Sequence, residues 1–271
     1  MQELLEAGVH FGHRVSRSHP RMKPYIYGAK DGVSIIDLAH SEKLLKEASD
    51  AVYKLGKDGK VMLIVGTKKQ AKELVESLAK EAGAPYITSH WIGGLLTNFD
   101  EIKRNITKLS SLKQEKLSGE LKRYTKKEQL LISRRLEKFE QNLGGIADLN
   151  KIPDALFIVD AVIENTAVKE AKKMGIILIG FSDTNADPTN FDYPVPSNDD
   201  GIKALKIICE TLIRSYGEGK KSASETARVE TEKKKEEGDG AKLDGAVADE
   251  AAELEEVIEK KVLEESERKT E

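Results

Sequence analysis

Three segments of the sequence concentrate side chains that can bind a polyanion. Residues 10–30 interleave His, Arg and Lys with Tyr, and residues 89–99 read SHWIGGLLTNF. Residues 101–143 carry 12 Lys plus Arg against 6 Glu. Cations neutralise phosphates and planar rings stack on exposed bases, so these segments favour an RNA partner.

A second interpretation of the same segments stays open on composition alone. Their cations would be solvated, and their aromatic and apolar side chains would pack against the body of the protein. The side chains concerned are Tyr25, Ile26, Tyr27 and Trp91.

The net charge of the whole chain hides how the charges are distributed. The 271 residues hold 44 Lys plus Arg and 47 Asp plus Glu, a net charge of −3 that argues against a nucleic-acid partner. Residues 217–271 account for 11 basic and 18 acidic side chains, a net charge of −7. Residues 1–216 therefore carry +4, which keeps a nucleic-acid partner open for them.

Two loops are the places where an enzyme or a nucleotide sensor would hold its ligand. GTKKQ at 66–70 lacks the glycine patterns of phosphate-binding loops, although helix-start amides with Lys68 and Lys69 could bind a phosphate. DTNADP at 183–188 has two carboxylates that suit magnesium, but its Asn, Asp and Pro favour a turn. A free nucleotide or a magnesium ion is therefore the weaker hypothesis.

The histidines and the cysteine give no sign of catalysis. His10, His13 and His19 lack the neighbouring Cys or the Glu of a known metal pattern, so we expect no bound metal and no cofactor. Cys209 lies in an apolar helical pattern and is expected in the core. A single cysteine forms no internal disulfide, which favours a reducing compartment.

The hydropathy of the chain gives no membrane segment. No stretch approaches the roughly 18 apolar residues of a membrane span, and the amino terminus does not resemble a signal peptide. We expect a cytoplasmic protein without a membrane partner.

Strands and helices that would position these segments are expected to alternate along most of the chain. Strands are predicted at 32–38, 61–67, 85–91, 155–160, 176–183 and 192–196, and helices at 41–55, 68–82, 164–174 and 199–215. This alternation predicts βαβ units and hence an α/β fold with a doubly wound, mainly parallel sheet.

Residues 101–143 interrupt the alternation, because they show helical periodicity without a strand. Apolar residues recur every three or four positions, at Ile102, Ile106 and Leu109 and again at Ile132, Leu136, Phe139 and Leu143. Breakers stand between the two series, at 118–119 and 124–125. The pattern predicts an antiparallel helical hairpin inserted into the α/β body.

These boundaries divide the chain into three parts. The body comprises residues 1–100 and 144–216 and includes the basic N-terminal arm, and the hairpin comprises residues 101–143. Residues 217–271 form an acidic, low-complexity tail without aromatic residues, which we expect to be disordered in isolation.

Several blocks of the sequence resemble a known family. The blocks are LLEAGVHFGH (4–13), MKPYIYGAKDGVSIIDL (22–38), WIGGLLTNF (91–99), LEKFEQNLGGI (136–146), PDALFIVD (153–160), and DTNADP followed by DYPVPSNDDGIKAL (183–205). In order and at consistent spacing, from about residue 3 to 216, they resemble the bacterial small-subunit ribosomal proteins of the S-two family.

The resemblance carries expectations about fold and function. It implies a flavodoxin-like parallel sheet with an inserted antiparallel coiled-coil hairpin. It also implies a structural constituent of the small ribosomal subunit that binds small-subunit ribosomal RNA near the head-body junction and supports translation. The partners it implies are neighbouring small-subunit ribosomal proteins and the large mRNA-binding protein of that subunit, whose recruitment it would support, and it implies no enzymatic activity.

Fourteen residues are expected at the RNA interface, from the charge pattern and the matching blocks together. They are His13, Arg14, Arg17, Arg21, Lys23, Tyr25, Lys30, Lys68, Lys69, Trp91, Thr97, Asn98, Lys103 and Arg104.

The sequence departs from the family pattern at a few positions. Ser16 and Ser18 lower the density of positive charge in the arm. Ser197 stands where the family usually has Gly, which would strain the backbone if that position needs a positive φ. Ala186 stands where Cys or another small residue is common, which removes a possible ligand for the zinc discussed for some members.

Overall fold

The computed structural model describes residues 1–119 and 123–226. By its internal contacts the chain divides into two units, Met1–Lys221 and Ser222–Glu271. Everything below concerns the first unit, except that the described residues of the second, 222–226, are helical. None of the helices in the described ranges is long and apolar enough to cross a membrane.

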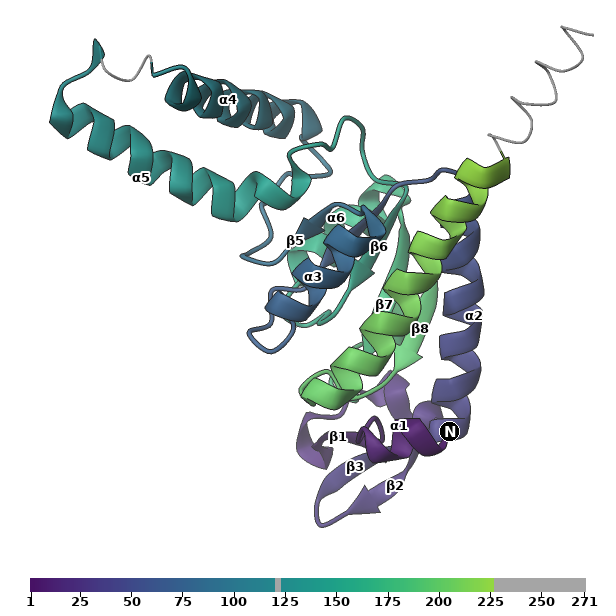
Figure 1. Ribbon diagram of the computed structural model, residues 1–271. Helices are drawn as coiled ribbons and strands as arrows, with labels where there is room; N and C mark the ends of the chain where they lie inside the picture. The colour runs from purple at the N-terminus through teal and green to yellow at the C-terminus, as the bar shows by residue number, and fades with distance from the viewer. Residues whose placement is uncertain (120–122, 227–271) are drawn as a thin grey trace, which may run out of the picture. The chain divides into compact units, whose positions relative to one another are not determined.

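A parallel five-stranded sheet forms the centre of the first unit (Figure 1). Its strands are β4 (Met62–Val65), β5 (Tyr86–Ile87), β6 (Ala155–Ile158), β7 (Ile177–Ser182) and β8 (Tyr193–Pro196), in the order β5-β4-β6-β7-β8. Counted along the chain, this is the order 2-1-3-4-5 of flavodoxin-like sheets. The predicted α/β fold with a doubly wound parallel sheet is confirmed.

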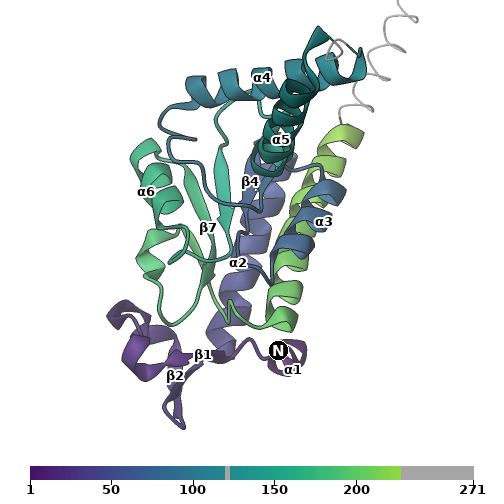
Figure 2. The same cartoon turned by 90° about the vertical axis from the view of Figure 1, so that its left-hand side faces the viewer.

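Helices cover both faces of this sheet (Figure 2). One face packs against α2 (Leu38–Lys57), α3 (Lys72–Ala82) and a final helix over residues 202–221, and the other against α6 (Asn165–Met174) and the hairpin. Along β4 the side chains alternate between the two cores, because Met62 and Ile64 join the first and Leu63 and Val65 the second. Both faces are therefore buried, which explains why β4 and β6 read as continuous apolar runs.

Cys209 lies in the first of these cores with no exposed surface, as expected. Burial raises the pKa of its thiol, so the thiol stays protonated at neutral pH.

The strand predicted at 32–38 exists, but the prediction that it joins the parallel sheet is wrong. It is β3 (Val33–Ile36), the centre of a separate antiparallel sheet in the order β1-β3-β2, with β1 (Phe11–Arg14) and β2 (Ile26–Lys30). Asp31 and Gly32 both have positive φ, at 52° and 77°, and close a two-residue hairpin between β2 and β3. This turn pairs β3 with its immediate neighbour, whereas joining the parallel sheet would need a longer crossover.

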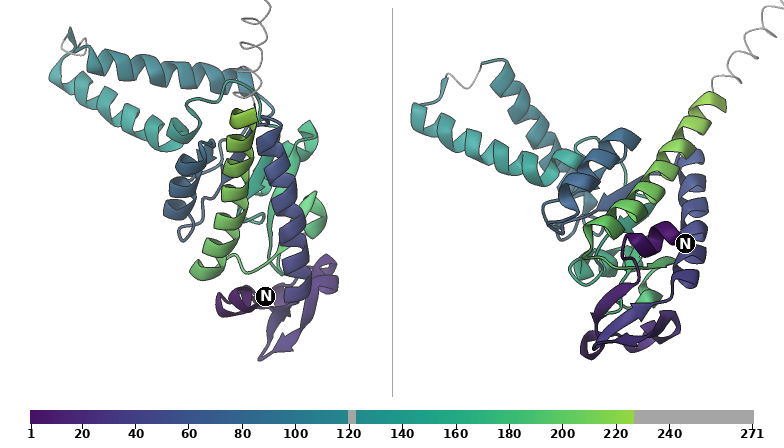
Figure 3. Two further views of the ribbon diagram at one scale, coloured as in Figure 1. Left: turned by 45° about the vertical axis from the view of Figure 1, so that its right-hand side comes forward. Right: turned by 60° about the horizontal axis from the view of Figure 1, so that its bottom comes forward.

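The basic arm is thus more regular than its turn-rich sequence suggests. It begins with α1 (Gln2–Glu6), and between β1 and β2 it holds two 3-10 helices, η1 (Val15–Arg17) and η2 (Pro20–Tyr25). We use the name arm for residues 1–37. Figure 3 shows the small sheet at one end of the central sheet.

The predicted hairpin consists of α4 (Phe99–Leu117) and α5 (Lys126–Leu143), which return along each other (Figure 1). Both predicted breakers lie between these helices, and residues 120–122 lie outside the described ranges. α5 starts with a capping box, in which Thr125 accepts a bond from the backbone N–H of Glu128 while the Glu128 carboxylate accepts from Thr125. Apolar residues of α4 and α5, among them Ile102, Ile106 and Leu136, join the core on the α6 side of the sheet.

A close backbone approach fixes the base of the hairpin. A Cβ on Gly145 would stand 2.3 Å from the carbonyl oxygen of Tyr86, so only glycine fits where the chain passes from α5 to the η4 turn (Gly144–Ile146) beside β5.

The final helix continues past the expected start of the tail at residue 217. Gly217 and Gly219 are buried, and a Cβ on Gly219 would lie 2.2 Å from the Tyr53 carbonyl oxygen of α2. The expected end of the body at 216 therefore falls inside a packed helix. Ser197 shows no positive φ, since Asp31 is the single such non-glycine residue in the described ranges, and the conditional strain at Ser197 does not arise.

Candidate nucleic-acid interface

The carboxyl ends of the parallel strands and the arm meet at one end of the molecule. The segments that follow β4, β6, β7 and β8 bring Lys68, Asp160, Asp183 and Asp199 together, and β1 adds His13. In open α/β sheets this edge is where ligands bind. Here its side chains bind one another.

Lys68 lies at the centre of this cluster and is bound by three carboxylates. Its Nζ lies 3.1 Å from Asp160 Oδ2, 2.7 Å from Asp199 Oδ1 and 2.7 Å from Asp200 Oδ1. Its side chain is 12% exposed. Burial opposes the charge, but the bonds to Asp199 and Asp200 outweigh burial and raise the pKa of Lys68. The ammonium group is thus bound by three carboxylates and largely buried, so it is not available to bind an RNA phosphate.

His13 ties the arm to the end of β7. Its Nδ1 lies 3.2 Å from Asp183 Oδ1 and its Nε2 3.5 Å from Asp200 Oδ2, and its backbone N–H donates to Thr184 Oγ1 at 2.8 Å. Contact with the Asp183 carboxylate raises the pKa of His13 against the opposing effect of burial. A Cβ on neighbouring Gly12 would stand 2.4 Å from Thr184 Cγ2, so the arm can approach this closely only with glycine there.

The cluster holds four carboxylates against Lys68 and His13, which disfavours a bound nucleotide. Burial, together with the charges of Asp183 and Asp160, raises the pKa of Asp199. A nucleotide phosphate would meet these acids, and the helix whose amides were to hold it begins only at Lys72. Ligand atoms of His13, Asp199 and Asp200 lie within 4.8 Å of one another, but Lys68 already supplies a positive charge to both aspartates.

The DTNADP segment forms a turn at its carboxyl end. Asp187 accepts the backbone N–H of Thr189 at 3.0 Å and caps the η5 turn (Pro188–Asn190), in line with the turn interpretation. Its other oxygen accepts from Arg21 Nη1 at 2.7 Å, and the same nitrogen donates to Thr189 Oγ1 at 2.7 Å. Arg21 thus secures the arm to the body, although its side chain stays largely exposed.

The remaining cations of the arm point into solvent. Four of them are exposed, and across the ranges that the structure describes no carboxylate forms an ion pair with any of them: Arg14, Arg17, Lys23 and Lys30. Of these four, Lys23 lines a cavity of about 690 Å³ between the arm and residues 188–194, together with Arg21, Tyr25 and four prolines among others. Unpaired cations beside an aromatic ring suit a phosphate backbone.

The loop at residues 88–98 folds around the carboxylate of Glu170 on α6. Glu170 accepts bonds from Trp91 Nε1 at 3.2 Å, from the backbone N–H of Gly94 at 2.8 Å and Leu96 at 3.1 Å, and from the backbone N–H and hydroxyl of Thr97 at 3.3 Å each. Burial opposes the charge, but these donors outweigh burial and lower the pKa of Glu170. Trp91 and Thr97 therefore organise this loop, and exposed Asn98 leads into α4.

The structure does not bring all fourteen expected residues together. Lys103 and Arg104 lie on α4, which follows the loop at residues 88–98 and lies away from the arm (Figure 1). Arg104 pairs with Glu101 at 3.1 Å, while Lys103 and Lys69 are exposed and form no ion pair with the described acids. Tyr25 is half-buried with its ring edge toward His40, at 6.2 Å between centroids.

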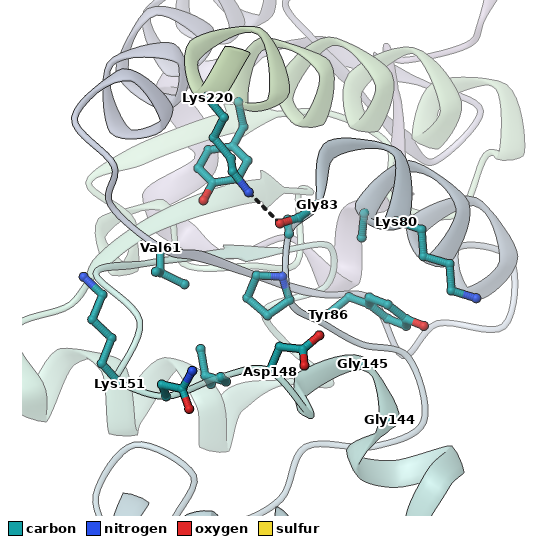
Figure 4. A pocket seen from close by; sticks show the side chains of 15 residues that line it. Val61, Lys80, Gly83, Tyr86, Gly144, Gly145, Asp148, Lys151 and Lys220 are labelled. Atoms are coloured by element: carbon teal, nitrogen blue, oxygen red, sulfur yellow. Dashed lines mark hydrogen bonds between the residues drawn. The ribbon is translucent and has the colours of Figure 1, made fainter. Parts of the chain in front are cut away.

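A second cavity, of about 690 Å³, lies at the amino ends of β4 and β5 near the base of the hairpin. Figure 4 shows Lys80, Lys151 and Lys220 around it, with Lys220 Nζ donating to the Gly83 carbonyl at 2.7 Å. Lys80 pairs with Glu76 and Lys151 with Asp154. Each of these lysines is already bonded within the protein, unlike the four exposed cations of the arm.

Three features of this region are absent from the sequence expectations. Glu170 and the acids around Lys68 lie far apart in the chain, and no local spacing marks them. Tyr27 was assigned only to the packing alternative, yet it is 83% exposed. A break in strand register around Tyr27 places it there, and no local pattern reveals such a break.

Comparison with known proteins points the same way as the matching blocks. The sequence model of the family described as Ribosomal protein S2 matches residues 4–219. A protein of Nitratiruptor sp. named "Small ribosomal subunit protein uS2" is 46% identical over 220 residues, covering 81% of this chain and 82% of the relative. Proteins of the same name from Aliarcobacter butzleri and Geotalea uraniireducens are 41% and 43% identical over 232 residues, covering 86% of this chain and 88% and 91% of the relatives.

Proposed function

The chain belongs to the ribosomal protein S2 family, and on that premise we propose that its arm binds small-subunit ribosomal RNA. Its role in the small subunit is structural, since the family is one of ribosomal proteins and is not known for enzymes. Small-subunit ribosomal RNA is the partner of the arm, and the interface is held by phosphate contacts.

The observation that carries the proposal is the set of unpaired cations on the arm. Arg14, Arg17, Lys23 and Lys30 stand exposed at the end where the arm is fastened to the sheet by His13 and Arg21. A fastened surface loses little conformational entropy when it binds, so its charges act on the phosphates at low cost. Lys69, Thr97, Asn98 and Lys103 are proposed as further contacts, whereas Lys68, Trp91 and Arg104 act through the contacts described above.

The finer parts of the proposal extend the family membership. The protein lies near the junction of head and body in the cytoplasmic ribosome, contacts neighbouring small-subunit proteins and supports recruitment of the large mRNA-binding protein. α4 and α5 supercoil as a coiled coil, and the functional division is into body with arm, hairpin and acidic tail.

The hairpin is proposed as the protein-facing part, because its exposed large apolar side chains in the described ranges are aliphatic and none is aromatic. Leu117 is 88% exposed, and Leu130 and Leu131 are exposed on α5. Exposed aliphatic side chains gain more from a protein surface than from a phosphate backbone. Photocrosslinking from position 130 in purified small subunits should give protein adducts; adducts to RNA alone would contradict this assignment.

Two charge-matched triple variants test the RNA proposal. One replaces Arg14, Arg17 and Lys23 by Ala, and the other replaces the exposed hairpin residues Lys108, Lys116 and Lys138 by Ala. Each removes three positive charges, so a nonspecific loss of charge affects both equally. Sedimentation of tagged protein with small subunits, over a series of salt concentrations, measures the occupancy.

The arm variant should leave the subunit at lower salt than the wild type and show a weaker salt dependence. Each lost phosphate contact lowers the slope of log affinity against log salt by about 0.7 to 0.9. The hairpin variant should resemble the wild type. Equal retention of the arm variant and the wild type at every salt concentration would refute RNA binding through the arm.

A further inference from the structure

Tyr27 interrupts the register of the small antiparallel sheet. Ile26 pairs with Ile36 and Gly28 pairs with Ile35, so Tyr27 is one extra residue in β2 opposite a single step of β3. Such a bulge leaves the extra residue unpaired and redirects its side chain. The edge position of β2 in the order β1-β3-β2 leaves one side of this strand without a neighbour.

The Tyr27 side chain is the most exposed aromatic of the arm. It is 83% exposed, and within the described ranges its ring forms no contact with another ring or with a cation, and its hydroxyl no hydrogen bond. Tyr25, two residues earlier, is half-buried and faces His40. A large ring exposed to water is stabilised when a flat apolar partner covers it.

The surface next to Tyr27 is open and basic. A Cβ on Gly28 would meet no atom within 4 Å, so the space over the residue that follows Tyr27 is open. Lys30 and Arg14 both pair with Val33, from opposite sides of β3. The two cations therefore flank Val33 on the outward face, because neighbouring Ser34 is buried. The turn residue Asp31 is the one acid between β2 and β3.

We propose that Tyr27 is a stacking site for an unpaired base of small-subunit ribosomal RNA, with Lys30 and Arg14 holding the flanking phosphates. This inference rests on the proposed function and adds a residue and a mode of recognition to it. Aromatic side chains beside cations recognise single-stranded RNA in this way, because every base offers a flat face while the cations hold its phosphate.

The charges favour RNA over a protein as the occupant. Residues 10–37 hold five Arg or Lys and only two acids, Asp31 and Asp37. Asp37 caps α2 by accepting the backbone N–H of Ala39, so its charge is already engaged. The exposed ring thus lies in a segment whose cations outnumber its acids by five to two.

Three substitutions at position 27 separate stacking from other contacts. Tyr27→Phe keeps a ring, Tyr27→Leu keeps an apolar side chain without a ring, and Tyr27→Ala removes both. We expect the dissociation constant for small subunits stripped of this protein to rise about 10- to 100-fold for Ala and nearly as much for Leu, and to stay within about twofold for Phe. The salt slope should not change, because no charge is removed, and melting curves should match since the ring is exposed.

A photoreactive phenylalanine analogue at position 27 identifies the partner in intact small subunits. Adducts that nuclease digestion shortens support the proposal, and adducts to protein alone overturn it. Equal affinity of Ala and wild type, or of Leu and Phe, also overturns it. If wild-type protein binds with a salt-dependent affinity while any of these results appears, the stacking site fails and the proposed function survives; wild-type protein that does not bind overturns both.

Discussion

The arm and the hairpin are both basic, yet they differ in the exposed apolar side chains that accompany their charges. The hairpin has the larger net charge, +6, but Arg104, Lys113 and Arg123 pair with glutamates of the hairpin itself. The arm has fewer cations, and four of them form no ion pair with any described acid. Eight described cations of the hairpin also form no ion pair with the described acids, so unpaired charge does not by itself separate the two regions. The arm exposes Tyr27 among its cations, whereas the hairpin exposes Leu117, Leu130 and Leu131.

The two regions also differ in how they are fastened. The hairpin is joined to the body by apolar side chains such as Phe99, Ile106 and Leu143. The arm is joined by Leu4 and Val9 in the first core and also by a buried polar cluster around Lys68 and His13. Apolar burial depends little on pH, while the polar cluster depends on the protonation of its members.

The largest difference in the free energy of unfolding is expected between two lysine variants, one in the cluster that joins the arm to the sheet and one in the hairpin. Lys68→Ala leaves the carboxylates of Asp160, Asp199 and Asp200 without their counter-charge, and should lower the free energy of unfolding by about 3 kcal/mol. Lys113→Ala breaks an exposed pair with Glu140 and should cost less than about 1 kcal/mol. Urea titration at pH 7 measures both; equal values would remove the contrast.

A smaller effect is expected at the loop that leads from β5 into the hairpin. Glu170→Ala leaves Trp91 Nε1 and the amides of Gly94, Leu96 and Thr97 without their acceptor, and should cost about 2 kcal/mol. Tryptophan fluorescence during the same titration reports the change directly, because Trp91 is the one tryptophan in the chain. Glu137→Ala, on the exposed face of α5, is the control and should be neutral; a loss as small as the control's would contradict the role of Glu170.

The smallest effect is a pH dependence of the polar cluster that joins the arm to the sheet. The raised pKa of His13 stabilises the folded state fully below the ordinary value of 6.5, and this stabilisation is lost as pH rises through the raised value. The lowered pKa of Asp183, by contrast, contributes stability that is lost only as pH falls below 3.8.

Hydrogen exchange between pH 6 and pH 9, corrected for its intrinsic rate, measures this difference. Amides of β1 should lose protection as pH rises, while those of α5 should not, because its shifted groups, Glu128 and Glu140, titrate in acid. His13→Gln should weaken the trend in β1, and the raised pKa of Asp199 in the same cluster accounts for the part that remains. Parallel behaviour of β1 and α5 would show that the two regions are not fastened differently.

Much of the framework could be predicted from local pattern. Periodicity located the strands of the parallel sheet and both hairpin helices, because apolar side chains repeat with the period of the element that buries them. The breakers at 118–119 and 124–125 bounded α4 and α5 to within a few residues. The expected strand at 32–38 was found, but its partners were not, since partner choice depends on the Asp31–Gly32 turn and on the register of β1 and β2.

The candidate site could be predicted only in part. The exposed cations of the arm were all named, because charge is visible in the sequence. Lys68 was named for the same reason, yet three carboxylates from separate segments bind it. Trp91 and Thr97 were named as interface residues, yet their polar groups donate to Glu170, which no pattern marked.

By itself the sequence determined the alternation of elements, the inserted hairpin, the uneven charge and the family to which the chain belongs. The tertiary structure alone decided which cations are free and which rings are exposed. The reason is physical: periodicity and composition are local properties, whereas an ion pair or a strand bulge depends on atoms that only the folded chain brings within a few ångströms of one another. The fastened arm, with its unpaired cations and its exposed Tyr27, is a product of that folding.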